Sequence, residues 1–396
     1  MRTSVFTALI ALLTTSVTVL AQPGSLDLNF DGDGIVYTPT SDYGGGRSVA
    51  VQTDGRIVVV ALLPDLNSGT SAMQILRYMP DGSMDNSFGT FGRVTVTSNS
   101  SGLEPIGLAL QNDGEIVVAH DIGGHMAVLR FTSNGDPDNS FGGTGVVSTS
   151  FSTGVISSAN CVAVQSDGKI IAAGFAADAG GIPHLALVRY TADGFLDTSF
   201  SYDGKVTTVI NAVEGDVVYS LAITPDGSIL AGGIEGNAFD SQDIVVKYMP
   251  DGTLDNTFGT NSISQTGFSG NTSTFGTMVL QPDGRIVFCG TVVDFNENGF
   301  GVARLTANGL LDPTFGNGGT QTTLLPQGGN ACASMAMQAD GKLVLTGQSG
   351  GDVALVRYTT DGSLDPSFGN GGSVVTALPT TDYGFGMTIQ SDGKIV

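Results

Sequence analysis

The strongest constraint on this chain is a motif that returns along the sequence at nearly regular intervals. Its clearest copy spans residues 187–200 and reads Leu-Val-Arg-Tyr-Thr-Ala-Asp-Gly-Phe-Leu-Asp-Thr-Ser-Phe. Each copy ends in a phenylalanine, and the seven phenylalanines are Phe30, Phe88, Phe141, Phe200, Phe258, Phe315 and Phe368. They lie 58, 53, 59, 58, 57 and 53 residues apart. A period of this length is typical of repeat arrays and propellers.

One repeat, residues 47–98, contains four short segments of strand character. Residues 48–52 and 56–61 flank an Asp-Gly turn, and two further strands are expected at 72–78 and 92–97. Residues 56–61 are almost continuously apolar, which favours burial on both faces of the strand. Four antiparallel strands per repeat form the blade of a β-propeller, and we therefore predict an all-β propeller of four-stranded blades. An open β-solenoid is the weaker alternative, because its coils are usually shorter and lack such hairpins.

The count of landmarks predicts how the ring closes. Seven Asp-Gly pairs begin at Asp54, Asp113, Asp167, Asp226, Asp283, Asp340 and Asp392, but only six third strands are present. The unmatched pieces are residues 26–38 at the front and 387–396 at the end. We expect six complete blades and a split, incomplete seventh, all in one domain over residues 22–396. The last strand stops at Val396, which predicts a truncated C-terminus.

Residues 1–21 form a separate segment with the features of a cleaved secretory signal. Arg2 supplies the positive start, an apolar run follows, and Val19-Leu20-Ala21 suits a signal peptidase. A membrane anchor is the weaker alternative, because the run is short and has no basic flank. We therefore expect an exported bacterial protein, secreted or on the cell surface, without membrane insertion after signal cleavage.

The charge of the chain excludes some classes of partner. Loss of Arg2 with the signal leaves 14 basic and 37 acidic residues, a formal charge of −23. Such a surface repels nucleic acids and anionic membranes, so neither is expected as a partner. Solubility alone explains the charge, although an acidic surface could also attract Ca²⁺. Many of the aspartates lie in the repeated turns, where their side chains favour turn formation.

A basic residue and an aspartate recur eight residues apart in every complete copy. The pairs are Arg77 and Asp85, Arg130 and Asp138, Arg189 and Asp197, Lys247 and Asp255, Arg304 and Asp312, Arg357 and Asp365. We interpret them as charge-assisted pairs that hold a turn, with the following phenylalanine buried between blades. Calcium is the alternative use of these turns, because Asp81-x-Ser83-x-Asp85 groups oxygen atoms. The aspartate-rich segment 27–33 resembles an EF-hand start, but Thr38 stands where glutamate is required.

The cysteines and histidines fit no catalytic or metal motif. Cys161, Cys289 and Cys332 are expected as buried free thiols, although the last two could meet because their repeats are consecutive. His125 and His184 occupy equivalent positions, five residues before the strand arginine, and a metal or catalytic pair there is the weaker interpretation. We predict no high-affinity transition metal. No Ser-His-Asp set or phosphate-binding loop is visible, so no catalytic, cofactor or metal residue is assigned.

Loops of two kinds are expected on the two faces of the propeller. The Asp-Gly hairpins and phenylalanine turns are uniform, whereas residues 62–71, 175–183, 234–242 and 291–298 share little. A variable face on a uniform scaffold favours binding. We predict a binding or structural scaffold that contacts an unknown protein or glycan through these loops and remains monomeric. The alternative is a secreted hydrolase or lyase acting on polysaccharide, with candidate carboxylates Asp178, Glu214, Asp240, Asp243, Asp294 and Glu297.

The repeat unit resembles the bacterial delta-60 repeat. The resemblance rests on two segments of the repeat. One is Gln-x-Asp-Gly-Lys-Ile, as in residues 165–170, and the other is the motif from Leu-Val-Arg-Tyr to Ser-Phe in residues 187–200. The resemblance covers nearly everything after the signal segment. It implies an exported or surface-associated propeller of uncharacterised activity, and it provides no catalytic residues to transfer.

Overall fold

The computed structural model describes residues 22–39, 45–65, 70–98, 107–152, 155–237, 240–268, 272–293, 297–378 and 382–396. The predicted signal segment, residues 1–21, lies outside these ranges. Within them the chain forms strands and turns only. The described residues therefore contain no helix long and apolar enough to cross a membrane.

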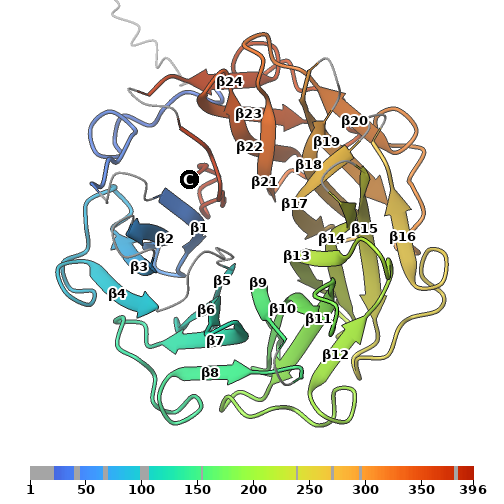
Figure 1. Cartoon of the computed structure of the whole chain (residues 1–396). Coiled ribbons are helices and arrows are strands. Elements are labelled where there is room, and N and C mark those ends of the chain that lie inside the picture. The colour runs from blue at the N-terminus through green and yellow to red at the C-terminus, as the bar shows by residue number, and fades with distance from the viewer. Residues whose placement is uncertain are drawn as a thin grey trace, which may run out of the picture.

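Six antiparallel sheets of four strands each are arranged in a ring, as predicted from the repeat (Figure 1). We name them blades 1 to 6 in chain order. Blades 1 to 3 are β1(Gly45–Val51), β2(Ile57–Asp65), β3(Thr70–Tyr78), β4(Arg93–Ser98); β5(Gly107–Leu110), β6(Ile116–Ile122), β7(His125–Phe131), β8(Val146–Thr149); and β9(Ser157–Val164), β10(Ile170–Ala177), β11(Pro183–Tyr190), β12(Lys205–Thr208). Blades 4 to 6 are β13(Asp216–Ile223), β14(Ile229–Asn237), β15(Asp240–Tyr248), β16(Ile263–Thr266); β17(Thr272–Leu280), β18(Ile286–Val293), β19(Gly299–Leu305), β20(Thr320–Thr323); and β21(Ala331–Met337), β22(Leu343–Ser349), β23(Asp352–Tyr358), β24(Ser373–Thr376).

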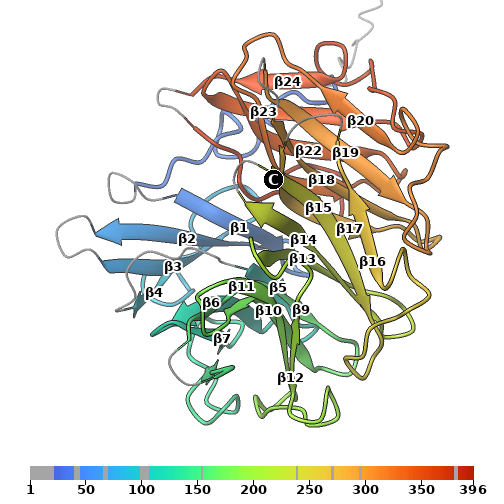
Figure 2. The same ribbon diagram turned by 45° about the vertical axis from the view of Figure 1, so that its right-hand side comes forward.

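The first strand of each blade lies nearest the centre of the ring and the fourth lies at the periphery (Figure 1). Figure 2 shows the same ring turned, with the twist of the sheets visible. We call the end of the blades that carries the Asp-Gly hairpins the hairpin face. The connections from second to third strand and from fourth strand to the next blade lie at the other end, which we call the loop face.

The hydrophobic core lies between successive blades. Each main cluster joins two neighbours, as Ile171 and Leu187 of blade 3 do with Ile244 and Val246 of blade 4. The second strand is buried on both sides because it lies between two sheets, which explains its continuous apolar sequence. The motif phenylalanines of all six blades are also fully buried.

A glycine of the next blade packs against each motif phenylalanine. A Cβ added to Gly252 would lie 2.8 Å from the ring of Phe200, so only glycine fits this close approach. The adjoining backbone is also bonded, since the Ser201 N–H donates to the Asp251 carbonyl at 2.8 Å. The phenylalanine turn of each blade is thus fixed to the third-strand turn of the next blade.

The two terminal segments meet in the sector between blade 6 and blade 1 (Figure 1). The N-terminal segment reproduces the contact between blades on both sides: the Gly369 N–H donates to Pro23 O, and the Asp31 N–H donates to Asp81 O, each at 2.8 Å. Residues 388–396 form a hairpin, and Lys394 forms an ion pair with Asp27 at 3.0 Å. The predicted split seventh position is therefore occupied by pieces of both chain ends.

The first strands of blades 1, 3, 4, 5 and 6 share a β-bulge that the sequence pattern did not predict. The ladder between first and second strand skips one residue, which is Arg47 in blade 1, Asn160 in blade 3, Tyr219 in blade 4 and Ala333 in blade 6. In blade 5 the shift falls at Gly276 and its neighbour. A bulge leaves one residue unpaired and redirects its side chain.

Candidate functional site

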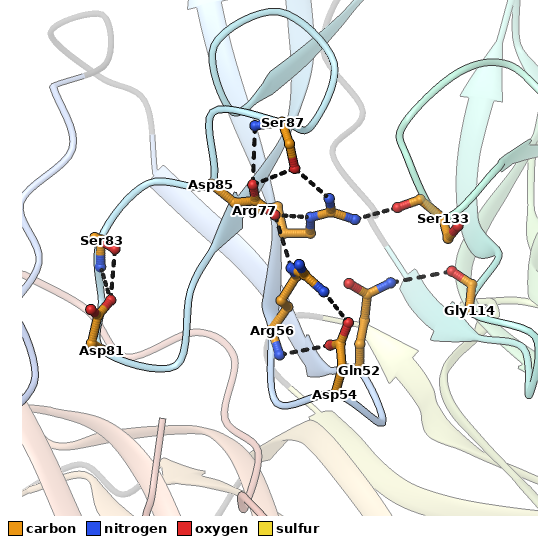
Figure 3. Close-up of polar contacts among 10 residues, drawn as sticks. All are labelled: Gln52, Asp54, Arg56, Arg77, Asp81, Ser83, Asp85, Ser87, Gly114 and Ser133. Carbon is orange, nitrogen blue, oxygen red and sulfur yellow. Dashed lines mark hydrogen bonds and ion pairs between the residues drawn. The ribbon is translucent and has the colours of Figure 1, made fainter.

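The repeated arginine–aspartate pairs form, and they are part of a larger network that Figure 3 shows for blade 1. Arg77 Nε donates to Asp85 Oδ2 at 2.8 Å, and Arg56 Nε lies 3.0 Å from the same oxygen. The backbone N–H and the hydroxyl of Ser87 both donate to Asp85 Oδ1. Arg77 Nη1 reaches the carbonyl of Ser133 in blade 2, so the network also ties one blade to the next.

The same arrangement recurs around the ring. In blade 3, Arg189 donates to Asp197 at 2.8 Å and its guanidinium lies 4.6 Å from the Phe200 ring centre. Burial favours a raised pKa for Asp197, but hydrogen bonds from Ser199 and the charges of Arg189 and Lys169 outweigh it and lower the pKa to about 2. A carboxylate so fully engaged has no free lone pair for a substrate. The repeated pairs are thus structural.

The proposed calcium turns separate into two hydrogen-bonded groups (Figure 3). Asp81 Oδ1 accepts from the N–H and hydroxyl of Ser83, whereas Asp85 is held by arginines. In the described part of the chain, no three His, Cys, Asp or Glu residues are placed to hold a metal ion. Calcium binding and the absence of a transition metal both stay predictions.

A histidine lies between two aspartates on the loop face, between blades 3 and 4. His184 Nδ1 lies 3.6 Å from Asp216 Oδ2, and His184 Nε2 lies 3.6 Å from Asp178 Oδ2. Burial raises the pKa of Asp216, and the N–H donors of Ile210 and Asn211 offset this only in part. The backbone N–H of Ile182 is the main cause that lowers the pKa of Asp178. The two carboxyls around one imidazole therefore differ in acidity.

Neighbouring residues extend this group into what we call the loop-face cluster: Asp178, His184, Glu214, Asp216 and Asn237. Asn237 Nδ2 donates to Glu214 Oε1 at 2.6 Å. The second predicted histidine, His125, starts β7 opposite Ile122. Sequence spacing related the two histidines but could not place Asp216 beside His184, because that contact joins different repeats.

The remaining candidate carboxylates do not join the loop-face cluster as a group. Glu297 is exposed beside β19. Asp294 and the side chain of Asp240 lie outside the described residues. Asp243 was predicted as a loop carboxylate, which is wrong: it lies inside β15 opposite Ile234 and Thr266 and is fully buried. The variable region extends into β15 because that strand is longer than the repeat pattern indicates.

Asp243 is unusual because neither carboxylate oxygen has a hydrogen bond of normal geometry to a described residue. Burial is the main cause that raises its pKa to about 7, and the nearby hydroxyl of Ser273 counters this only weakly. An unpaired buried carboxylate is costly, so Asp243 is protonated below neutral pH. It lies between blades 4 and 5 and is closed off from solvent.

The bulged residues form a second group, at the centre of the ring. Each lies five positions before the first residue of its Asp-Gly hairpin motif, and Phe385 holds the same position before Gln390. We call this set the axial ring: Arg47, Asn160, Tyr219, Gly276, Ala333 and Phe385. Unlike the residues of the repeated networks, these six are all different in kind.

Two hollows lie on the hairpin face, opposite the predicted binding loops. The larger, about 680 Å³, is lined by Gln165, Thr224, Pro225 and Gln281 among others, and the smaller, about 490 Å³, lies beside it around Gln111. Their walls are built from the uniform hairpins, where Asp167 pairs with Lys169 and Asp113 accepts from the backbone N–H of Glu115. The groups that differ from blade to blade lie in the loop-face cluster and the axial ring.

The cysteines are buried, as predicted. Cys161 stands alone in β9, and burial raises the pKa of its thiol strongly. Cys289 and Cys332 interact across the interface of blades 5 and 6, where the Cys332 N–H donates to Thr291 Oγ1 at 2.9 Å. These thiols take part in packing.

Comparisons with known proteins agree with this architecture. A family model described as "Domain of unknown function (DUF5122) beta-propeller" matches residues 52–88, 111–141, 165–200, 224–258, 281–315 and 338–368, together just over half of the chain. A comparison with curated proteins found no match.

Several solved structures are similar in fold. Virginiamycin B lyase from Staphylococcus aureus is 12% identical over 72% of this chain and 74% of that one, with a TM-score of 0.38. Endo-arabinase from Bacteroides thetaiotaomicron is 11% identical over 71% and 95%, with a TM-score of 0.37. Acylaminoacyl peptidase from Pyrococcus horikoshii is 10% identical over 85% of this chain and 46% of that one, with a TM-score of 0.42. Likenesses this distant carry no information on activity.

Proposed function

Since the chain belongs to the DUF5122 beta-propeller family, whose fold is defined but whose function is unknown, we propose that it is an exported binding scaffold. In this proposal the repeat is of the delta-60 kind, the protein is a monomer at or beyond the cell surface, and its ligand is a protein or a glycan. The acidic composition and the signal-like residues 1–21 support the exported location.

The observation that carries the proposal is the contrast between the two faces. On the hairpin face, polar side chains repeat from blade to blade and bond to one another. On the described part of the loop face, the polar contacts of the loop-face cluster are found between blades 3 and 4 and are not repeated at the other blades. The connection that leads to Asp216 also carries two exposed apolar side chains, Val209 and Val213. Singular polar and apolar groups on a repeated scaffold are suited to recognition of a specific ligand.

The test is a binding measurement with matched variants. Purified protein is titrated with candidate polysaccharides and with surface-protein fractions, and Glu214→Ala combined with Asn237→Ala is compared with Tyr202→Ala. Tyr202 is 94% exposed in a turn of the hairpin face, so its removal controls for general surface effects. Binding should weaken in the double variant alone. Binding that is lost instead with Gln281→Ala would place the site in the hairpin-face hollow and contradict the proposal.

One observation favours an enzyme as the second candidate. His184 lies 3.6 Å from each of two carboxylates. Burial raises the pKa of Asp216, whereas backbone N–H donors lower the pKa of Asp178. Pairs of groups with separated pKa values are characteristic of acid–base catalysis. The alternative is a hydrolase or lyase acting on polysaccharide. It predicts release of reducing ends or unsaturated sugars that His184→Ala abolishes while the melting temperature stays unchanged.

A further inference from the structure

We propose that the axial ring is a binding site for a neutral glycan, with Tyr219 and Phe385 as stacking platforms and Asn160 as a hydrogen-bonding group. The proposal rests on the binding function proposed above and adds both a ligand class and a second, deeper site.

The geometry of the bulges places these residues together. The strands that carry Arg47, Asn160, Tyr219, Gly276 and Ala333 are the innermost of their blades (Figure 1). Asn160 Nδ2 donates to the Val218 carbonyl, next to Tyr219, at 2.8 Å. A Cβ on Gly276 would lie 2.7 Å from the Ala333 carbonyl. The side chains therefore form one level of the ring.

Phe385 closes the level between the last and first blades. The Arg47 guanidinium lies 4.3 Å from the Phe385 ring centre. The ring of Tyr383 stacks on that of Phe385, with ring centres 5.6 Å apart and an angle of 23° between the two planes. Two partly exposed aromatic rings that stack on each other offer an apolar surface on which a planar ligand face can pack.

Exposure distinguishes these aromatics from those of the core. Tyr219 is 40% exposed and Phe385 is 37% exposed, whereas the motif phenylalanines are fully buried. Packing between blades does not account for partly exposed aromatics at these positions. Gly276 and Ala333 contribute almost no side-chain volume at the same level.

The chemistry of these residues selects the ligand class. Aromatic rings stack on the apolar faces of sugars, and amide groups bind sugar hydroxyls. Acidic residues outnumber lysine and arginine by 37 to 15, which disfavours an anionic polymer. A bulge is a means by which a repeated strand presents a different side chain in each blade, and bulges are frequent next to binding and active sites.

The experiment is calorimetric titration with neutral hexaoses: β-1,4-gluco-, β-1,3-gluco-, β-1,4-xylo-, β-1,4-manno- and α-1,4-gluco-oligosaccharides. We expect at least one to bind, and Tyr219→Ala and Phe385→Ala each to weaken that binding by about tenfold or more. Tyr219→Phe keeps the ring and should retain binding within about threefold, as should the control Tyr202→Ala. Melting temperatures confirm that each variant is folded.

Two outcomes would overturn this inference and leave the proposed function standing. In one, no hexaose binds but a protein ligand binds through Glu214 and Asn237. In the other, a hexaose binds with equal affinity to Tyr219→Ala, Phe385→Ala and the unchanged protein. Binding of a hexaose that the axial substitutions abolish, with no effect of the loop-face double variant, would support the axial ring as a site separate from the loop-face cluster.

Discussion

Replacement of Asp243 by asparagine should change how the stability of the protein depends on pH. Asp243 is fully buried in β15 with no normal hydrogen bond to a described residue, and burial raises its pKa from 3.8 to about 7. Between these two values the folded state binds more protons than the unfolded state. The free energy of unfolding therefore falls as pH rises from about 4 to about 7. Stability is greatest below the unfolded-state pKa, and above the folded-state pKa the loss is complete.

The magnitude follows from the shift. A rise of about three pKa units corresponds to about 4 kcal/mol of stability lost at pH 8 relative to pH 4 through this one group. Asp243→Asn removes the ionisation and keeps the shape. The new amide also lacks a partner, which costs about 1–3 kcal/mol. That cost is the same at every pH, so the pH dependence of the difference between variant and unchanged protein isolates the carboxyl group.

Urea unfolding at pH 4, 5, 6, 7 and 8, followed by circular dichroism, measures this difference. From pH 4 to pH 8, the free energy of unfolding of the variant should rise by about 4 kcal/mol relative to that of the unchanged protein. Asp203→Asn, which removes an exposed carboxylate of a hairpin-face turn, is the control for the loss of one acidic group. A flat difference for Asp243→Asn would refute the reasoning, because it would show that Asp243 is stabilised as an anion by a neighbouring group.

Three further predictions concern the repeated architecture. Asp197→Ala should destabilise the protein by about 1–3 kcal/mol at pH 7, and because the folded pKa is lowered to about 2, the difference should shrink as pH falls towards 2; an unchanged melting temperature at pH 7 would contradict the structural role. Gly252→Ala should be far more destabilising in thermal melts than Gly393→Ala, since both have φ near +88° but only the first would place a Cβ 2.8 Å from a phenylalanine ring; equal effects would mean that backbone strain alone decides. The three cysteines should react with a thiol reagent only after denaturation, and rapid labelling of the folded protein would contradict their burial.

The sequence predicted the parts of the fold that depend on local spacing. The eight-residue interval from Arg189 to Asp197 fixes an ion pair within one connection, and the phenylalanine three residues later is buried wherever the pair recurs. The division into a hairpin face and a loop face could also be predicted, because the Asp-Gly hairpins recur at regular positions in the sequence. These features lie within single repeats, where contacts join residues close in sequence.

The features that the sequence missed join different strands or different repeats. The bulge at Tyr219 depends on Gly233 across the ladder, whose added Cβ would lie 1.9 Å from the Val217 carbonyl. The contact of His184 with Asp216 crosses from blade 3 to blade 4. Neither position differs from an ordinary strand residue when one repeat is read alone, so only the assembled ring shows them.

The pairing of the two terminal segments has a consequence for the order of events during synthesis. Gln22 donates to the carbonyl of Gly369, 347 positions away, and Asp27 meets Lys394. Blades contact their neighbours, so they can fold one after another as the chain leaves the ribosome. Residues 22–38 can pair with blade 1 as soon as it has formed, since the Asp31 N–H donates to Asp81 O, but their partners in blade 6 and in residues 388–396 are made last. The earliest segment of the propeller is therefore the last to be held on both sides, and until then the side that meets blade 6 stays open to other strands and to chaperones.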